Sequence, residues 1–147
     1  MKTLNVLILL ILINSCWAGN CLALGDNCRG VHQQLPEDGV CREIISTLNL
    51  QVPNKEKQIN EPFKINQIDK YMSKGDWHFV WTTPEHLERG VFVLRGTVPN
   101  FEYILVWGGV ASSEEETSVL EWFVKSIPDA PVELLECVSY TITHGTD

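Results

Sequence analysis

The chain begins with a short apolar segment, which constrains the fold most because it decides the compartment in which the rest folds. Lys2 precedes an apolar run from Leu4 to Ile13, and Cys16-Trp17-Ala18 places small residues at positions −3 and −1 before Gly19. This is the pattern of a secretory signal peptide, and a run of about ten apolar residues is shorter than the ~20 that a membrane helix needs. We predict a signal peptide over residues 1–18 and a secreted, extracellular domain over residues 19–147, folding where disulfides persist.

Two other interpretations of this segment stay open. Cleavage after Ala23 would also remove Cys21, and the three cysteines left would be an odd number in an oxidising compartment. Ile13-Asn14-Ser15-Cys16 is similar to a bacterial lipoprotein box, in which Cys16 would carry the lipid.

Size and charge indicate one acidic domain. Removal of 18 residues from 147 leaves 129, enough for a single core. Loss of Lys2 lowers Lys+Arg from 11 to 10 against 19 Asp+Glu, a net charge of −9, which argues against nucleic acid or an anionic membrane as partner. From Gly96 to Asp147 nine acidic residues face one base, Lys125, so the acidity is concentrated there. This concentration of acidic residues indicates either a solvated face or a surface for a cationic partner.

Four cysteines remain after cleavage, and we predict that they form two disulfides. They are Cys21, Cys28, Cys41 and Cys137, for which three pairings are possible. We favour Cys21–Cys28 with Cys41–Cys137, because Cys41 lies in a predicted helix and Cys137 in a predicted strand. The spacing lacks the paired C-x-x-C elements of a zinc site, so no metal is predicted.

Periodicity predicts an α+β or mainly-β domain with an antiparallel sheet. A helix over residues 39–48 follows from the 3.6-residue spacing of Cys41, Ile44 and Leu48, with Asp38 as its N-cap. The segment 61–72 fits either a strand or a helical turn. Three strands are predicted over residues 77–82, 91–98 and 101–107, the last two joined by a tight turn at Pro99-Asn100.

A second helix and a final strand complete the prediction. Ser113 and Glu116 fit a capping box, and Pro128 ends the helix that they open. Alternate residues from Val132 to Ile142 are apolar except for Glu136, which predicts a last strand after this C-terminal helix.

The search for enzyme motifs is negative, and we predict no catalytic residue, no cofactor and no enzyme activity. The sequence has no G-x-x-x-x-G-K-[ST], H-E-x-x-H or G-x-S-x-G motif. His86 lies among the carboxylates of Glu85 and Glu88, which fits a solvated loop. His78 alternates with aromatic residues and is expected to face solvent or to make one hydrogen bond.

Trp77, Phe79 and Trp81 alternate along one strand and are expected to share a face of the sheet. Two interpretations are open: large rings form an ordinary core, or they line an apolar ligand pocket.

Gly75-Asp76-Trp77 resembles the G-x-W motif that opens the first barrel strand of lipocalins, with Cys41 and a helical segment upstream. The resemblance implies a barrel around a small hydrophobic ligand. A lipocalin barrel has about eight strands, and 70 residues follow Trp77, so an incomplete barrel is implied. The resemblance makes Trp77 structural and gives the pocket six candidate residues: Phe79, Trp81, Phe92, Leu94, Tyr103 and Leu105.

The sequence therefore favours a secreted, non-enzymatic binding protein that holds a small hydrophobic molecule against an aromatic-rich sheet. The alternative is a secreted protein–protein interaction factor of the venom, salivary or reproductive-fluid type, whose partner is an extracellular protein. Neither involves nucleic acid or a membrane span.

Overall fold

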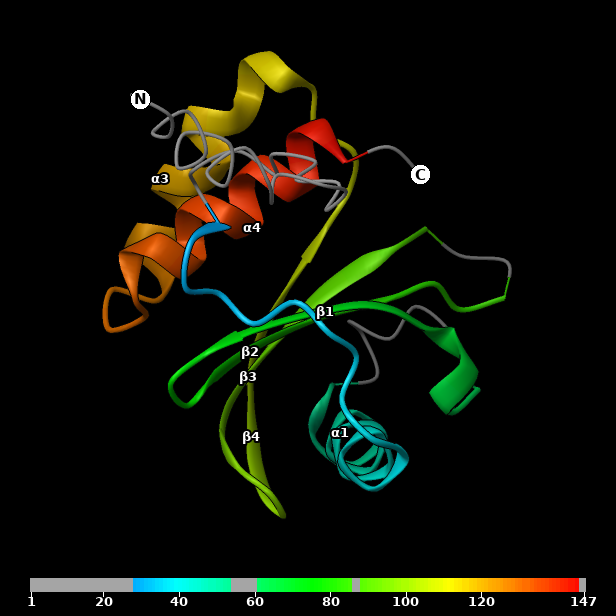
Figure 1. Ribbon diagram of the computed structural model, residues 1–147. Helices are drawn as coiled ribbons and strands as arrows, with labels where there is room; N and C mark the ends of the chain where they lie inside the picture. Colours follow the sequence, from blue (N-terminus) through cyan, green and yellow to red (C-terminus); the bar gives the residue numbers. More distant parts are fainter. Residues whose placement is uncertain (1–27, 54–60, 86–87, 146–147) are drawn as a thin grey trace, which may run out of the picture.

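The computed structural model describes residues 28–53, 61–85 and 88–145, and this part of the chain is a mixed α+β fold (Figure 1). A helix comes first, four strands follow, and two helices end the chain. The elements are α1 (Asp38–Gln51), the short 3₁₀ helix η2 (Ile65–Gln67), β1 (Ile68–Lys74), β2 (Trp77–Thr82), β3 (Gly90–Thr97), β4 (Asn100–Gly108), the 3₁₀ turn η3 (Ser113–Glu115), α3 (Glu116–Ser126) and α4 (Val132–His144).

The strands form an antiparallel meander in the order β1-β2-β3-β4 across the described ranges. The predicted antiparallel sheet is therefore confirmed, and the segment that fitted two alternatives supplies η2 and β1. β1 and β4 lie at opposite edges of this sheet, so the described strands stay open and do not close into a barrel. Figure 1 shows α1 on one face and α3 with α4 on the other, a three-layer arrangement.

Helix α1 covers one face of the sheet. Cys41, Ile44 and Leu48 are buried at helical spacing and pack with Phe92 and other sheet residues. The predicted helix is confirmed and extends to Gln51. Its predicted cap is wrong: Glu37 is the N-cap and makes no side-chain hydrogen bond there, whereas Asp38 lies in the first turn, where its negative charge complements the helix dipole.

Helices α3 and α4 cover the other face. Phe123 on α3 is fully buried and meets Phe79 of β2 edge to face, with ring centroids 5.4 Å apart. Trp77 and Trp81 belong to the same core cluster, which confirms that these three β2 residues share a face. The capping box of this region is formed by Ser112 and Glu115, one residue before the predicted pair, and opens the turn η3.

The predicted last strand is wrong, because residues Val132–His144 form helix α4. Leu134, Leu135, Cys137 and Val138 are all buried, at the adjacent and three- or four-residue spacings of one helical face. Alternation was misleading because Leu134 and Val138, which are four residues apart and so share a helical face, also share the parity of one strand face.

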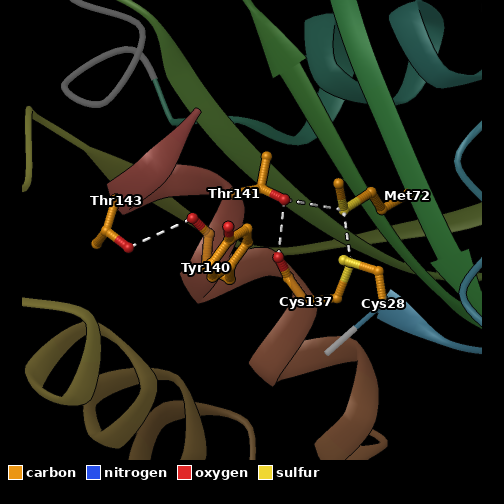
Figure 2. Close-up of a disulfide and its surroundings, with 6 residues drawn as sticks. All are labelled: Cys28, Met72, Cys137, Tyr140, Thr141 and Thr143. Carbon is orange, nitrogen blue, oxygen red and sulfur yellow. Dashed lines mark hydrogen bonds between the residues drawn. A yellow bond between two sulfur atoms is a disulfide. The ribbon is translucent and has the colours of Figure 1, made fainter. Parts of the chain in front are cut away.

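The preferred disulfide pairing is also wrong. Cys137 bonds to Cys28, with Cα atoms 4.6 Å apart and a sequence separation of 109 residues (Figure 2). Cys41 is a free, buried thiol among the cysteines that the structure describes, because α1 and α4 lie on opposite faces of the sheet. Cys21 lies outside the described residues, as does the predicted signal peptide.

Over the ranges that the structure describes, we find no helix with both the length and the apolar character that crossing a membrane requires.

Candidate functional site

The six residues predicted for a ligand pocket do not come together. Phe79, Trp81 and Leu105 face α3 and α4, whereas the other three face α1: Phe92, Leu94 and Tyr103. The register explains the division, because Phe92 pairs with Val80, and residues directly opposite in a sheet share a face. Trp81 is the one of the six that lines the cavity described next.

A cavity of about 250 Å³ lies between the sheet and the C-terminal end of α4. Its floor is one row of side chains across all the described strands: Lys70 pairs with Trp81, Trp81 with Val91, and Val91 with Trp107. All four line the cavity. The row alternates aromatic and aliphatic groups and ends in an ammonium group, so it offers an apolar surface with a polar end.

The walls come from segments distant in sequence. The last turn of α4 contributes Thr141, Ile142 and Thr143, and its C-cap contributes Gly145. The segment after β4 contributes Gly109, Val110 and Ala111. The hydroxyl of Thr141 donates to the carbonyl of Cys137 at 2.8 Å, and that of Thr143 donates to the carbonyl of Ser139 at 2.9 Å. Both hydroxyls thus have acceptors within the helix, and Ile142 is the apolar side chain that this turn adds to the lining.

The rim carries charges of both signs. Glu88 and Arg89 line the cavity together with Lys70. Arg89 Nε lies 3.5 Å from the carboxylate of Asp69, and the same carboxylate accepts a hydrogen bond from the hydroxyl of Thr83. Partial negative charge at the end of α4 adds to this pattern, so the rim is polar and close to electrically balanced.

His78 lies on the opposite face of the sheet from the cavity and forms a buried polar network. Its Nδ1 accepts a hydrogen bond from the Tyr71 hydroxyl at 2.6 Å, and its Nε2 donates to the carbonyl of Gly96 at 2.8 Å. This assignment makes the imidazole neutral. Burial lowers the pKa of His78, against the opposing effects of the Gly96 carbonyl and Asp76. The prediction that His78 faces solvent or makes one hydrogen bond is wrong.

Cys41 is buried beside this network. Its thiol donates to the carbonyl of Pro36 at 3.3 Å, and burial, followed by the negative charge of Asp38, raises the pKa of Cys41. Because the thiolate is the reactive form, this cysteine is a core residue of low nucleophilicity. The predicted Cys41–Cys137 bond is therefore corrected, and Cys21, the other predicted disulfide cysteine, lies outside the described residues.

His86 lies outside the described residues. In the ranges that are described, no group of three or more His, Cys, Asp or Glu side chains is arranged to hold a metal ion.

Sequence reasoning missed most of the cavity. Trp107, Val91 and Lys70 were not assigned to a pocket, although they pair with Trp81 directly or through one neighbour. With Trp81 assigned to the pocket, the pairing register of the neighbouring strands would have placed Val91 and Trp107 in the same row of lining residues. The wall from α4 could not be found while Val132–His144 was interpreted as a strand.

The chain matches no protein-family model, and searches of the curated proteins and of the solved structures likewise give no match. The resemblance to lipocalins stays a prediction.

Proposed function

We propose that this chain is an exported, non-enzymatic binding protein that holds a small hydrophobic molecule in the cavity over Trp81, Val91 and Trp107. The observation that carries the proposal is the 250 Å³ cavity whose floor is this apolar row and whose rim is charged. Small-molecule sites commonly combine apolar lining with a few polar groups that set orientation. Export is proposed on the pattern of residues 1–18.

The cavity limits the size of the ligand. Its 250 Å³ falls below the ~300–1,000 Å³ of typical small-molecule sites, but exceeds the ~150 Å³ in which an apolar cavity holds benzene. The fitting class is a single substituted aromatic ring or a short aliphatic chain with one polar group. Long-chain fatty acids and retinoids are too large for this volume.

The test is a titration with 4-fluorobenzyl alcohol, followed by ¹⁹F NMR of the ligand. It has about nine non-hydrogen atoms, and at about −0.5 kcal/mol per atom the binding free energy is about −4.5 kcal/mol, a Kd of about 0.5 mM. We expect saturable broadening of the fluorine signal. A signal that responds only linearly up to several millimolar would contradict the proposal.

A matched pair of variants locates the binding. Ala111 is half-buried and lines the cavity, so Ala111→Phe fills it and should abolish saturation. Val124 is 44 % exposed on α3 and is not among the lining residues, so Val124→Phe should bind as the unaltered protein does. Equal binding by both variants would place the ligand elsewhere.

The alternative, a factor that binds another extracellular protein, is favoured by Trp122. This side chain is 40 % exposed on α3, and aromatic residues are enriched at the centres of protein interfaces. Trp122→Ser should then abolish capture of the partner while leaving probe binding unchanged, a result that would separate the two functions.

A further inference from the structure

We infer that the Cys28–Cys137 disulfide, acting through Met72, positions the α4 turn that walls the cavity, so that reduction of the disulfide weakens ligand binding. The ligand part of this inference rests on the proposed function. The structural part, control of the α4 turn by the disulfide, is testable without a ligand.

The contacts run from the disulfide to the cavity wall in two steps (Figure 2). Cys137 Sγ lies 3.6 Å from Met72 Sδ, and Thr141 Oγ1 lies 4.0 Å from the same sulfur. Since Cys137 Sγ is bonded to Cys28, it carries no proton, and its approach to Met72 is a packing contact. Thr141 lies one helical turn after Cys137, donates to the Cys137 carbonyl, and lines the cavity.

The burial of α4 changes along its length. Leu134, Leu135 and Val138 are at most 1 % exposed. Tyr140, Thr141 and Ile142 are half-buried, whereas Thr143 is buried. The disulfide is the covalent constraint nearest to the turn that borders the cavity, and Met72, 2 % exposed, contacts both.

Reduction changes the packing at this point. A dithiol reductant supplies two electrons and two protons, the sulfur–sulfur bond becomes two thiols, and the reductant is oxidised to a disulfide. Two thiol sulfurs cannot approach as closely as two bonded ones, and both sites are buried, at 7 % and 0 % exposure for Cys28 and Cys137. Met72 and the neighbouring Thr141 must move to make room for the separated sulfurs. This movement shifts the α4 turn that forms a wall of the cavity.

The ligand-independent test is hydrogen exchange of the full chain, oxidised and reduced. The Gly145 amide at the C-cap of α4 donates to the Thr141 carbonyl at 2.9 Å, and the Ile127 amide at the C-cap of α3 donates to the Phe123 carbonyl at 2.8 Å. We expect reduction to speed exchange at Gly145 by at least about 5-fold relative to Ile127. Unchanged exchange at Gly145 would overturn the inference even if the probe binds.

The binding test uses 4-fluorobenzyl alcohol on the same samples. We expect reduction to raise the Kd at least about 5-fold, the lower end of coupling between sites. A probe that binds neither form would refute the proposed function alone, and the exchange result would still decide the inference. A probe that binds both forms equally would refute control of binding by the disulfide.

Two variants keep the test decisive. Met72→Val leaves the disulfide intact but shortens the side chain that contacts Cys137 and Thr141. It therefore serves as the test if reduction unfolds the chain. We expect faster Gly145 exchange and weaker binding in this variant, and unchanged values would overturn the inference. Cys41→Ser removes the free thiol on the other face of the sheet and should alter neither measurement.

Discussion

The side chain of Gln51 completes the edge of the sheet, and its removal is expected to destabilise the fold measurably. Gln51 Nε2 donates to the carbonyl of Phe101 at 3.1 Å, and its Oε1 accepts from the amide of Tyr103 at 2.8 Å. Both partners belong to β4, an edge strand. One side-chain amide thus makes the pair of hydrogen bonds that a neighbouring strand would make, across 50 residues of sequence.

The magnitude follows from these two bonds. Each neutral hydrogen bond contributes about 0.5–1.5 kcal/mol net, and two give about 1–3 kcal/mol. Two effects reduce this loss. Water can reach the freed groups of Phe101 and Tyr103, because neither bond is fully buried. Alanine also favours a helix by a few tenths of a kcal/mol over glutamine. Gln51→Ala should therefore lower the free energy of unfolding by about 1–2 kcal/mol.

The assay is urea denaturation of Gln51→Ala, Gln51→Glu and the neighbouring control Leu50→Ala. Leu50 is 82 % exposed, so its loss should change stability by less than about 0.5 kcal/mol. Glutamate accepts from Tyr103 but cannot donate to Phe101, so it should also destabilise. Because an uncovered edge pairs with other chains, sedimentation should show more self-association in Gln51→Ala. Equal stability of Gln51→Ala and the Leu50→Ala control would refute this reasoning.

Three further outcomes are expected. Cys28→Ser/Cys137→Ser should lose about 4.8 kcal/mol of unfolding free energy in the chain-entropy treatment of a loop with a separation of 109 residues, measured by denaturation against Cys41→Ser. Phe123→Ala should lose about 3–5 kcal/mol by cavity creation, because Phe123 is fully buried against Phe79; calorimetry checks this, and a loss below about 1 kcal/mol would contradict it. His78 has a lowered pKa, so its contribution is present above the unfolded-state pKa of about 6.5 and is lost as the pH falls through the folded-state pKa. Denaturation curves from pH 7.5 to 4.5 should show this loss, and His78→Gln should reduce it.

The elements that the sequence predicted well are those whose faces differ strongly in polarity. Helix α1 was predictable because Cys41, Ile44 and Leu48 recur on one side with polar residues between them. The strands β2 and β3 were predictable from β-branched and aromatic residues between turn-forming ones. Helix α4 was not, because it is apolar on much of its surface, and its alternating residues are also compatible with a strand.

The site was harder to predict, because it depends on register. Tyr103 and Leu105 have the same parity along β4 and were expected to face the same pocket. The pairing shifts between Val93 and Leu94, where Leu105 and Tyr103 are their partners. One extra residue in a strand reverses the alternation beyond it, so Tyr103 packs toward α1 and Leu105 toward α3 and α4.

The same irregularity makes the cavity row continuous. Phe101 and Tyr103 precede the shift and face α1, whereas Trp107 follows it and faces the other side. Without the extra residue, a Trp107 in phase with Tyr103 would also face α1, and the row from Lys70 through Trp81 and Val91 would end at β3. The apolar floor of the cavity therefore depends on a local break in strand pairing at β4, which regular alternation in the sequence conceals.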